Sequence, residues 1–109
     1  MDINYELYKV FYYVATTLSF SEASKQLYIS QSAVSQSIKV LEKKLNQNLF
    51  IRSTKKVQLT PEGEILLRHI EPAINLIKRG ENQSIESNTL GGGQLRICLL
   101  YTSLLYNHS

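Results

Sequence analysis

The sequence predicts a mainly α-helical fold in which three helices and a β-hairpin precede a long fourth helix. Three observations predict it. Between residues 20 and 39, two short stretches with helical apolar spacing flank a three-residue turn. Short apolar runs at 49–51 and 57–59 then flank a basic polar segment, as in a hairpin. A helix-start signal at Thr60 finally opens another stretch with helical spacing.

The first helix is predicted from Met1 to Leu18, with Asp2 or Asn4 as its N-cap. Its apolar residues form two neighbouring stripes, so we expect it to pack on two neighbours. The stripes are Leu7, Phe11, Val14 and Leu18, and beside them Tyr5, Tyr8, Tyr12 and Ala15.

The second helix has two candidate N-caps. Ser19 with Glu22 has the form of a capping box, whereas Ser21 better fits a helix whose apolar positions are Ala23 and Leu27. We expect Ser21 to be the cap.

The turn and the third helix follow directly. Turns of this kind often hold glycine because the backbone can be left-handed there, so Tyr28 would cost stability. Ser30 is the expected N-cap of a helix that runs to about Leu45 and ends at Asn46 or Asn48. Its inward stripe is Val34, Ile38, Leu41 and Leu45.

The outward face of the third helix is polar and uncharged except at its end. It carries Gln31, Ser32, Ser35, Gln36 and Lys39. A plain solvated helix usually carries Glu and Lys, since these residues favour the helix more than Ser does. Helix, turn and polar helix is the arrangement that places a helix in the DNA major groove. There Gln can pair with adenine, Ser with either base type, and the methyl of Ala33 can meet that of thymine, while Lys39 can reach guanine or a phosphate.

The predicted hairpin, or wing, carries Arg52, Lys55 and Lys56 at or near its tip. Such cations can enter the minor groove or follow the DNA backbone; alternatively, they only keep the hairpin soluble.

Through Thr60 there are eight Lys and Arg against four Asp and Glu, a net charge of +4, and beyond it four against five, a net charge of −1. The basic half therefore coincides with the predicted helix-turn-helix, as expected for a phosphate-bearing partner.

The fourth helix is predicted from Pro61, with Thr60 as N-cap, to about Ser84, a length of roughly 36 Å. This exceeds what a small core needs, so we expect it to pair with the same helix of a second chain. Pro72 should kink it without breaking it. The predicted dimerisation residues are Leu66, Leu67, Ile70, Ala73, Ile74 and Ile77.

The last part of the chain is predicted to be a linker, Asn88 to Gly93, followed by a first strand, Gln94 to Leu100.

A single cysteine, Cys98, excludes an internal disulfide, and neither a signal peptide nor a membrane span is predicted. We therefore expect a cytoplasmic protein without cofactor. Neither His69 nor His108 belongs to a metal-ligand cluster, which disfavours an enzyme.

Residues 19–67 resemble the N-terminal domain of the LysR-type transcriptional regulators. The segments that carry the resemblance are Ser30 to Ser35, Leu41-Glu42, Leu49 to Arg52, and Leu59 to Gly63, with the spacing between them. The resemblance implies a winged helix-turn-helix that dimerises through the long helix and binds double-stranded DNA in successive major grooves.

The resemblance also assigns residue roles and domains. Base contacts are expected from Gln31, Ser32, Ser35 and Gln36, and backbone or wing contacts from Ser21, Ser30, Lys39, Arg52, Ser53, Thr54, Lys55 and Lys56. Position 36 is often Arg in the family, so Gln36 removes the charge from that contact. The expected domains are a DNA-binding domain at 3–60 with its helix-turn-helix motif at 20–39, a linker helix at 61–87, and the start of a truncated effector domain at 88–109. No small-molecule effector is expected for this chain.

Two functions remain open from the sequence. The first is a dimeric, sequence-specific DNA-binding regulator. The second is a winged-helix adaptor that binds proteins through its long helix and never touches DNA. An adaptor should present large apolar residues on the outward face of its third helix, where this chain has Ser and Gln.

Overall fold

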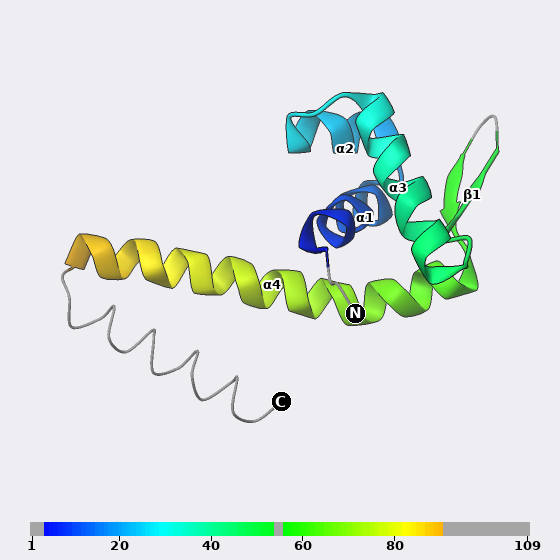
Figure 1. Ribbon diagram of the computed structural model, residues 1–109. Coiled ribbons are helices and arrows are strands. Elements are labelled where there is room, and N and C mark those ends of the chain that lie inside the picture. Colours follow the sequence, from blue (N-terminus) through cyan, green and yellow to red (C-terminus); the bar gives the residue numbers. More distant parts are fainter. Residues whose placement is uncertain (1–3, 54–55, 91–109) are drawn as a thin grey trace. The chain divides into compact units, whose positions relative to one another are not determined.

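The computed structural model describes residues 4–53 and 56–90 (Figure 1). Its elements confirm the predicted order of three helices, a hairpin and a long helix. They are α1 (Tyr5–Thr17), α2 (Phe20–Leu27), α3 (Gln31–Leu45), β1 (Phe50–Arg52), β2 (Val57–Leu59) and α4 (Pro61–Leu90). The chain divides into two compact units, of which the first ends at Pro72 and contains α1 to β2 and the first part of α4.

Side-chain caps and left-handed residues fix the ends of the first three helices. Asn4 caps α1 by accepting a hydrogen bond from the Glu6 N–H at 3.0 Å, so the second of the two predicted caps is observed. Each helix then ends in a residue with a left-handed backbone. These residues are Leu18, Tyr28 and Asn46, with φ of 53°, 57° and 53°.

The predicted cap of α2 was wrong. Ser19, not Ser21, is the N-cap, and its hydroxyl accepts from the Glu22 N–H at 3.0 Å. The Ser19 N–H in turn donates to the Thr17 hydroxyl at 3.3 Å, which ties the cap to the end of α1. The helix therefore starts at Phe20, earlier than its apolar positions suggest, because hydrogen bonding rather than apolar spacing decides where a helix begins.

The core of the first unit lies between α1, α2 and α3 and extends under the start of β1. All three helices and the hairpin contribute fully or almost fully buried apolar side chains: Val10, Phe11, Val14, Ala15, Ala23, Val34, Ile38, Leu41, Leu49 and Phe50. The Phe11 and Phe50 rings lie 5.5 Å apart and join α1 to β1. Burying each large side chain contributes about 1.5–3 kcal/mol.

Two details of the predicted α1 packing differ from the structure. Leu18 was placed on the first apolar stripe, but it follows the helix in the left-handed cap and is 45% exposed. Val10 was on neither stripe and is 5% exposed. The early end of α1 explains the first difference, because a residue beyond the helix no longer follows its spacing.

Strands β1 and β2 form a two-stranded antiparallel hairpin, as predicted. Phe50 pairs with Leu59 and Arg52 with Val57. After the last paired residue of β1, the Ser53 N–H donates to the Lys56 carbonyl at 3.1 Å. The Ser53 hydroxyl also donates to this carbonyl and accepts from the Lys56 N–H. Residues 54–55, between these two, lie outside the described part of the chain.

Thr60 links the hairpin to α4 and is its N-cap, as predicted. Its hydroxyl accepts from the Gly63 N–H at 3.0 Å and donates to the Asn48 carbonyl at 2.6 Å. The helix passes through Pro72 without interruption and reaches Leu90, three residues into the segment predicted as a linker. At about 1.5 Å per residue its 30 residues span about 45 Å. The strand predicted at 94–100 lies outside the described residues, in which no helix is long and apolar enough to cross a membrane.

Candidate nucleic-acid interface

The outward face of α3 is polar and accessible, as the sequence predicts. Gln31, Ser32, Gln36 and Lys39 are exposed, while Ser35 is half-buried. On the opposite face Val34, Ile38 and Leu41 are fully buried in the core. Packing on that inner face holds α3 in place and leaves the outer side chains free to face a ligand.

The start of α3 is fixed by its cap. The Ser30 hydroxyl accepts from the Ala33 N–H at 3.1 Å and lies 3.2 Å from the Ser32 hydroxyl. This bond confirms Ser30 as the predicted N-cap of α3. Because the helix N-terminus carries partial positive charge, this end of α3 is electrostatically suited to a phosphate.

The turn before α3 has the left-handed residue that the sequence suggested it needs. Tyr28 has φ 57° and ψ 39°, and its N–H donates to the Lys25 carbonyl at 3.3 Å. Its side chain is 94% exposed. A left-handed non-glycine residue costs about 1 kcal/mol, and here no burial of the ring offsets that cost.

An open groove of about 580 Å³ lies between the start of α2, the start of α3 and the hairpin. It is lined by Leu18, Ser19, Phe20, Ser21, Gln31, Ser53, Lys56, Val57 and Gln58. Four of these, Ser21, Gln31, Ser53 and Lys56, were predicted from the sequence as DNA-contacting residues. The fold thus brings predicted contacts from three separate segments to one groove. Thr54 and Lys55, also predicted, lie outside the described residues.

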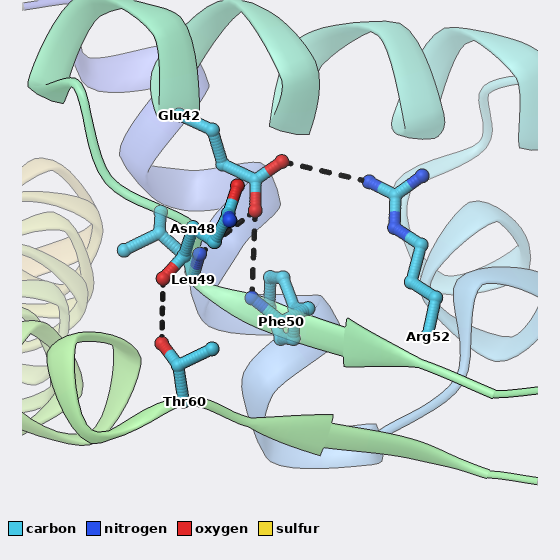
Figure 2. A network of polar contacts seen from close by, with 6 residues as sticks. All are labelled: Glu42, Asn48, Leu49, Phe50, Arg52 and Thr60. Atoms are coloured by element: carbon cyan, nitrogen blue, oxygen red, sulfur yellow. Dashed lines mark hydrogen bonds and ion pairs between the residues drawn. The ribbon is translucent and has the colours of Figure 1, made fainter.

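Arg52 was predicted as a DNA contact near the hairpin tip, but in the structure its guanidinium is engaged within the protein (Figure 2). One nitrogen of the guanidinium is 3.8 Å from a carboxylate oxygen of Glu42 on α3. The guanidinium carbon lies 4.7 Å from the centre of the Phe20 ring on α2. The Arg52 side chain retains an exposure of 37%.

Glu42 is the residue that sequence reasoning missed. No contact was predicted for it, yet its side chain is only 16% exposed. Its carboxylate accepts from the Leu49 N–H at 2.8 Å and the Phe50 N–H at 3.4 Å (Figure 2). The available signal was the segment Leu41-Glu42, which helped to carry the family resemblance.

The predicted dimerisation residues on α4 fall into three groups. Leu66, Leu67 and Ile70 are half-buried against the core of their own chain. Ile74 is 2% exposed, and Ala73 and Ile77 are exposed. Three apolar residues of α4 outside the predicted set are also exposed: Ile65 at 54%, Leu76 at 40% and Ile85 at 63%.

These elements define a winged helix-turn-helix domain: two helices joined by a tight turn, a first helix packed behind them, and a two-stranded wing. The chain belongs to the LysR family, because residues 5–64 match the family of bacterial regulatory helix-turn-helix proteins of that name. The resemblance read from the sequence is therefore confirmed.

Among the relatives is the HTH-type transcriptional regulator HdfR of Yersinia pestis, which is 40% identical over 82 residues, or 75% of this chain. A hydrogen-peroxide-bound mutant of Corynebacterium glutamicum OxyR matches 81% of this chain and 27% of its own, with 30% identity and a TM-score of 0.74. DarR of Vibrio fischeri, solved in complex with DNA, matches 84% of this chain and 32% of its own, with 28% identity and a TM-score of 0.67. The chain spans 28% of the length of HdfR.

Proposed function

We propose that this chain is the DNA-binding part of a transcription regulator, in which α3 enters the major groove and the hairpin follows the backbone or the adjacent minor groove. The observation that carries the proposal is the groove that collects Ser21, Gln31, Ser53 and Lys56 beside the exposed polar face of α3. Membership of the LysR family and the likeness to DarR bound to DNA support it.

The proposed contacts divide into two kinds. Gln31, Ser32, Ser35 and Gln36 would read bases, with Ser35 the least accessible of the four. Ser21, Ser30, Ser53, Lys56 and Lys39 would hold phosphates, together with Thr54 and Lys55, which lie outside the described residues. Since the base-reading face is neutral, specificity should rest on uncharged hydrogen bonds and affinity on the cations and helix ends.

Two copies should pair through α4 and so place two copies of α3 on successive half-sites. We propose that Ala73 and Ile77, with the exposed Leu76, make this contact, because Leu66, Leu67 and Ile70 already pack on their own core. Sedimentation equilibrium should show a dimer, and replacing Ile77 by Lys should shift it toward monomer. A monomeric wild-type chain at micromolar concentration would contradict the pairing.

We place the boundary between the DNA-binding domain and the linker helix at Thr60, where the hairpin ends and α4 begins.

DNA binding is tested by selecting preferred duplexes from a random pool and titrating the best one with salt. The logarithm of affinity should fall linearly with that of salt concentration. Gln31→Ala should lower the preference for the selected site by about 1–3 kcal/mol, whereas Gln83→Ala, a matched change at an exposed position of α4, should not. Lys56→Ala should weaken all duplexes alike and reduce the salt slope by about 1. Absence of salt-dependent binding to any duplex would refute the proposal and favour the protein-binding adaptor.

A further inference from the structure

We propose that Arg52 is a positioning residue of the hairpin, held by Glu42 and Phe20, and that it acts on DNA binding by orienting the hairpin and not by contacting a phosphate. This inference deepens the proposed function and rests on it. It reverses the role that the sequence suggested for Arg52, and it gives Glu42 a role in DNA binding although its carboxylate faces the protein interior.

Glu42 anchors the start of the hairpin to α3. Its carboxylate accepts two backbone hydrogen bonds, from Leu49 at 2.8 Å and Phe50 at 3.4 Å. These are charge-assisted bonds, which are stronger than neutral ones. Because Glu42 belongs to the same helix as the outward polar face, the first residues of the hairpin take their position from that helix.

Arg52 extends this anchor to the end of β1 (Figure 2). Its guanidinium lies between the Glu42 carboxylate, at 3.8 Å, and the Phe20 ring, at 4.7 Å. Phe20 is itself fixed, since its ring packs edge-on against Phe50 with centres 6.0 Å apart. One side chain of the hairpin thus joins the start of α2 and the C-terminal part of α3.

Direct phosphate binding by Arg52 would break this arrangement. The guanidinium would leave the Phe20 ring and remove the positive partner from a carboxylate that is only 16% exposed. A charge of low exposure is costly without its partner. Among the described residues of the hairpin, the cation that lines the groove is Lys56, which stands four residues further along and beyond the paired strands. We therefore assign the phosphate contact to Lys56 and the orientation of Lys56 to Arg52.

The test compares the whole wild-type chain with Glu42→Gln, Arg52→Ala, Arg52→Lys and the double variant Glu42→Gln/Arg52→Ala. Each is titrated against the duplex selected by the wild type, at several salt concentrations, and footprinted with hydroxyl radicals. Circular dichroism at the assay temperature establishes that each variant is folded. If Arg52→Ala unfolds, Glu42→Gln and Arg52→Lys carry the test, because both keep the size of the side chain.

Arg52→Ala should weaken binding between about threefold and about thirtyfold, the range expected for a partly exposed ion pair plus a cation–π contact. Its salt slope should fall by no more than that of Lys56→Ala, because the misplaced hairpin loses the Lys56 contact and Arg52 itself makes no phosphate contact. Glu42→Gln should also weaken binding, and the double variant should be no weaker than the weaker single variant. Arg52→Lys should not restore affinity, because an ammonium cannot stack on Phe20 as a planar guanidinium does. Protection under the hairpin should fade while protection under α3 remains.

Three results would overturn the inference. A salt slope reduced by about 1 in Arg52→Ala and restored in Arg52→Lys would make Arg52 a phosphate contact. Tighter binding by Glu42→Gln would make Glu42 a competitor of DNA for Arg52. Unchanged affinity in all variants would show that the cluster is irrelevant to binding. In each of these cases the wild type still binds DNA, so the proposed function stands; a wild type without salt-dependent binding would refute both.

Discussion

Replacing Gly63 by Ala should destabilise the first unit strongly, although alanine favours helices. Gly63 lies in the first turn of α4, beside Leu49 and Leu59. A Cβ atom there would lie 2.9 Å from Leu59 Cδ2 and 3.2 Å from the Leu49 carbonyl carbon, and closer still to the Leu49 carbonyl oxygen. Contacts below 3.0 Å are not found for real Cβ atoms, so either the helix or the strand must move.

The loss of folding free energy in Gly63→Ala depends on which neighbouring atoms must shift. The closest neighbour is backbone, and the same Leu49 carbonyl accepts from the Thr60 N–H at 3.0 Å. Overpacking typically costs about 1–3 kcal/mol, and weakening that hydrogen bond costs about 1 kcal/mol more. The higher helix propensity of alanine returns at most about 1 kcal/mol. The net loss should be about 1–3 kcal/mol, which lowers Tm by roughly 5–20 °C in a domain of this size.

Thermal and urea unfolding followed by circular dichroism measure the effect. Gly80→Ala is the matched control, because it makes the same change in the same helix at a site where the new Cβ meets no atom within 4 Å apart from its chain neighbours and the adjacent helix backbone. That variant should gain up to about 1 kcal/mol of helix stability. If Gly63→Ala were as stable as the wild type, or changed in the same direction as Gly80→Ala, the close approach of α4 to the hairpin would be wrong.

Three further changes test the turns and caps by urea unfolding. Tyr28→Gly should stabilise the fold by about 1 kcal/mol because it relieves a left-handed tyrosine whose ring is 94% exposed; a loss of stability would show that the ring makes a contact. Ser30→Ala should cost about 0.5–2 kcal/mol through loss of the cap of α3, with Ser30→Asp close to neutral. Thr60→Val should cost about 1–3 kcal/mol, since it leaves the Asn48 carbonyl and the Gly63 N–H without their partner; an unchanged midpoint would rule out that network.

Local signals predicted most of the first unit. The apolar spacing of Val34, Ile38 and Leu41 identifies the buried face of α3 because a helix repeats every 3.6 residues whatever surrounds it. Caps such as Ser30 and Thr60 act within three residues, so they too are readable from the chain. The choice between Ser19 and Ser21 failed because both satisfy the local pattern, and the tie to Thr17 at the end of α1 decides it.

The sequence predicted which residues belong to the candidate site, but it did not predict all the contacts that they make. The outward polar face of α3 followed from its spacing, and Lys56 from its place in the hairpin. The engagement of Arg52 could not be predicted, because its partners Glu42 and Phe20 are 10 and 32 residues away and meet it only after the hairpin folds back on the helices. Long-range pairs of this kind leave no periodic trace in a sequence.

The exposed residues of α3 differ from the residues that hold the fold, and this difference bears on how such a domain changes its target during evolution. Gln31, Gln36 and Lys39 are exposed, whereas Val34 and Ile38 are buried in the core and Glu42 is bonded to the start of the hairpin. Exchange of exposed residues away from such contacts usually alters stability by no more than about 0.5 kcal/mol. If α3 reads bases as proposed, new operator preferences can therefore be sampled one outward residue at a time, while the scaffold that orients the helix and the wing remains the same.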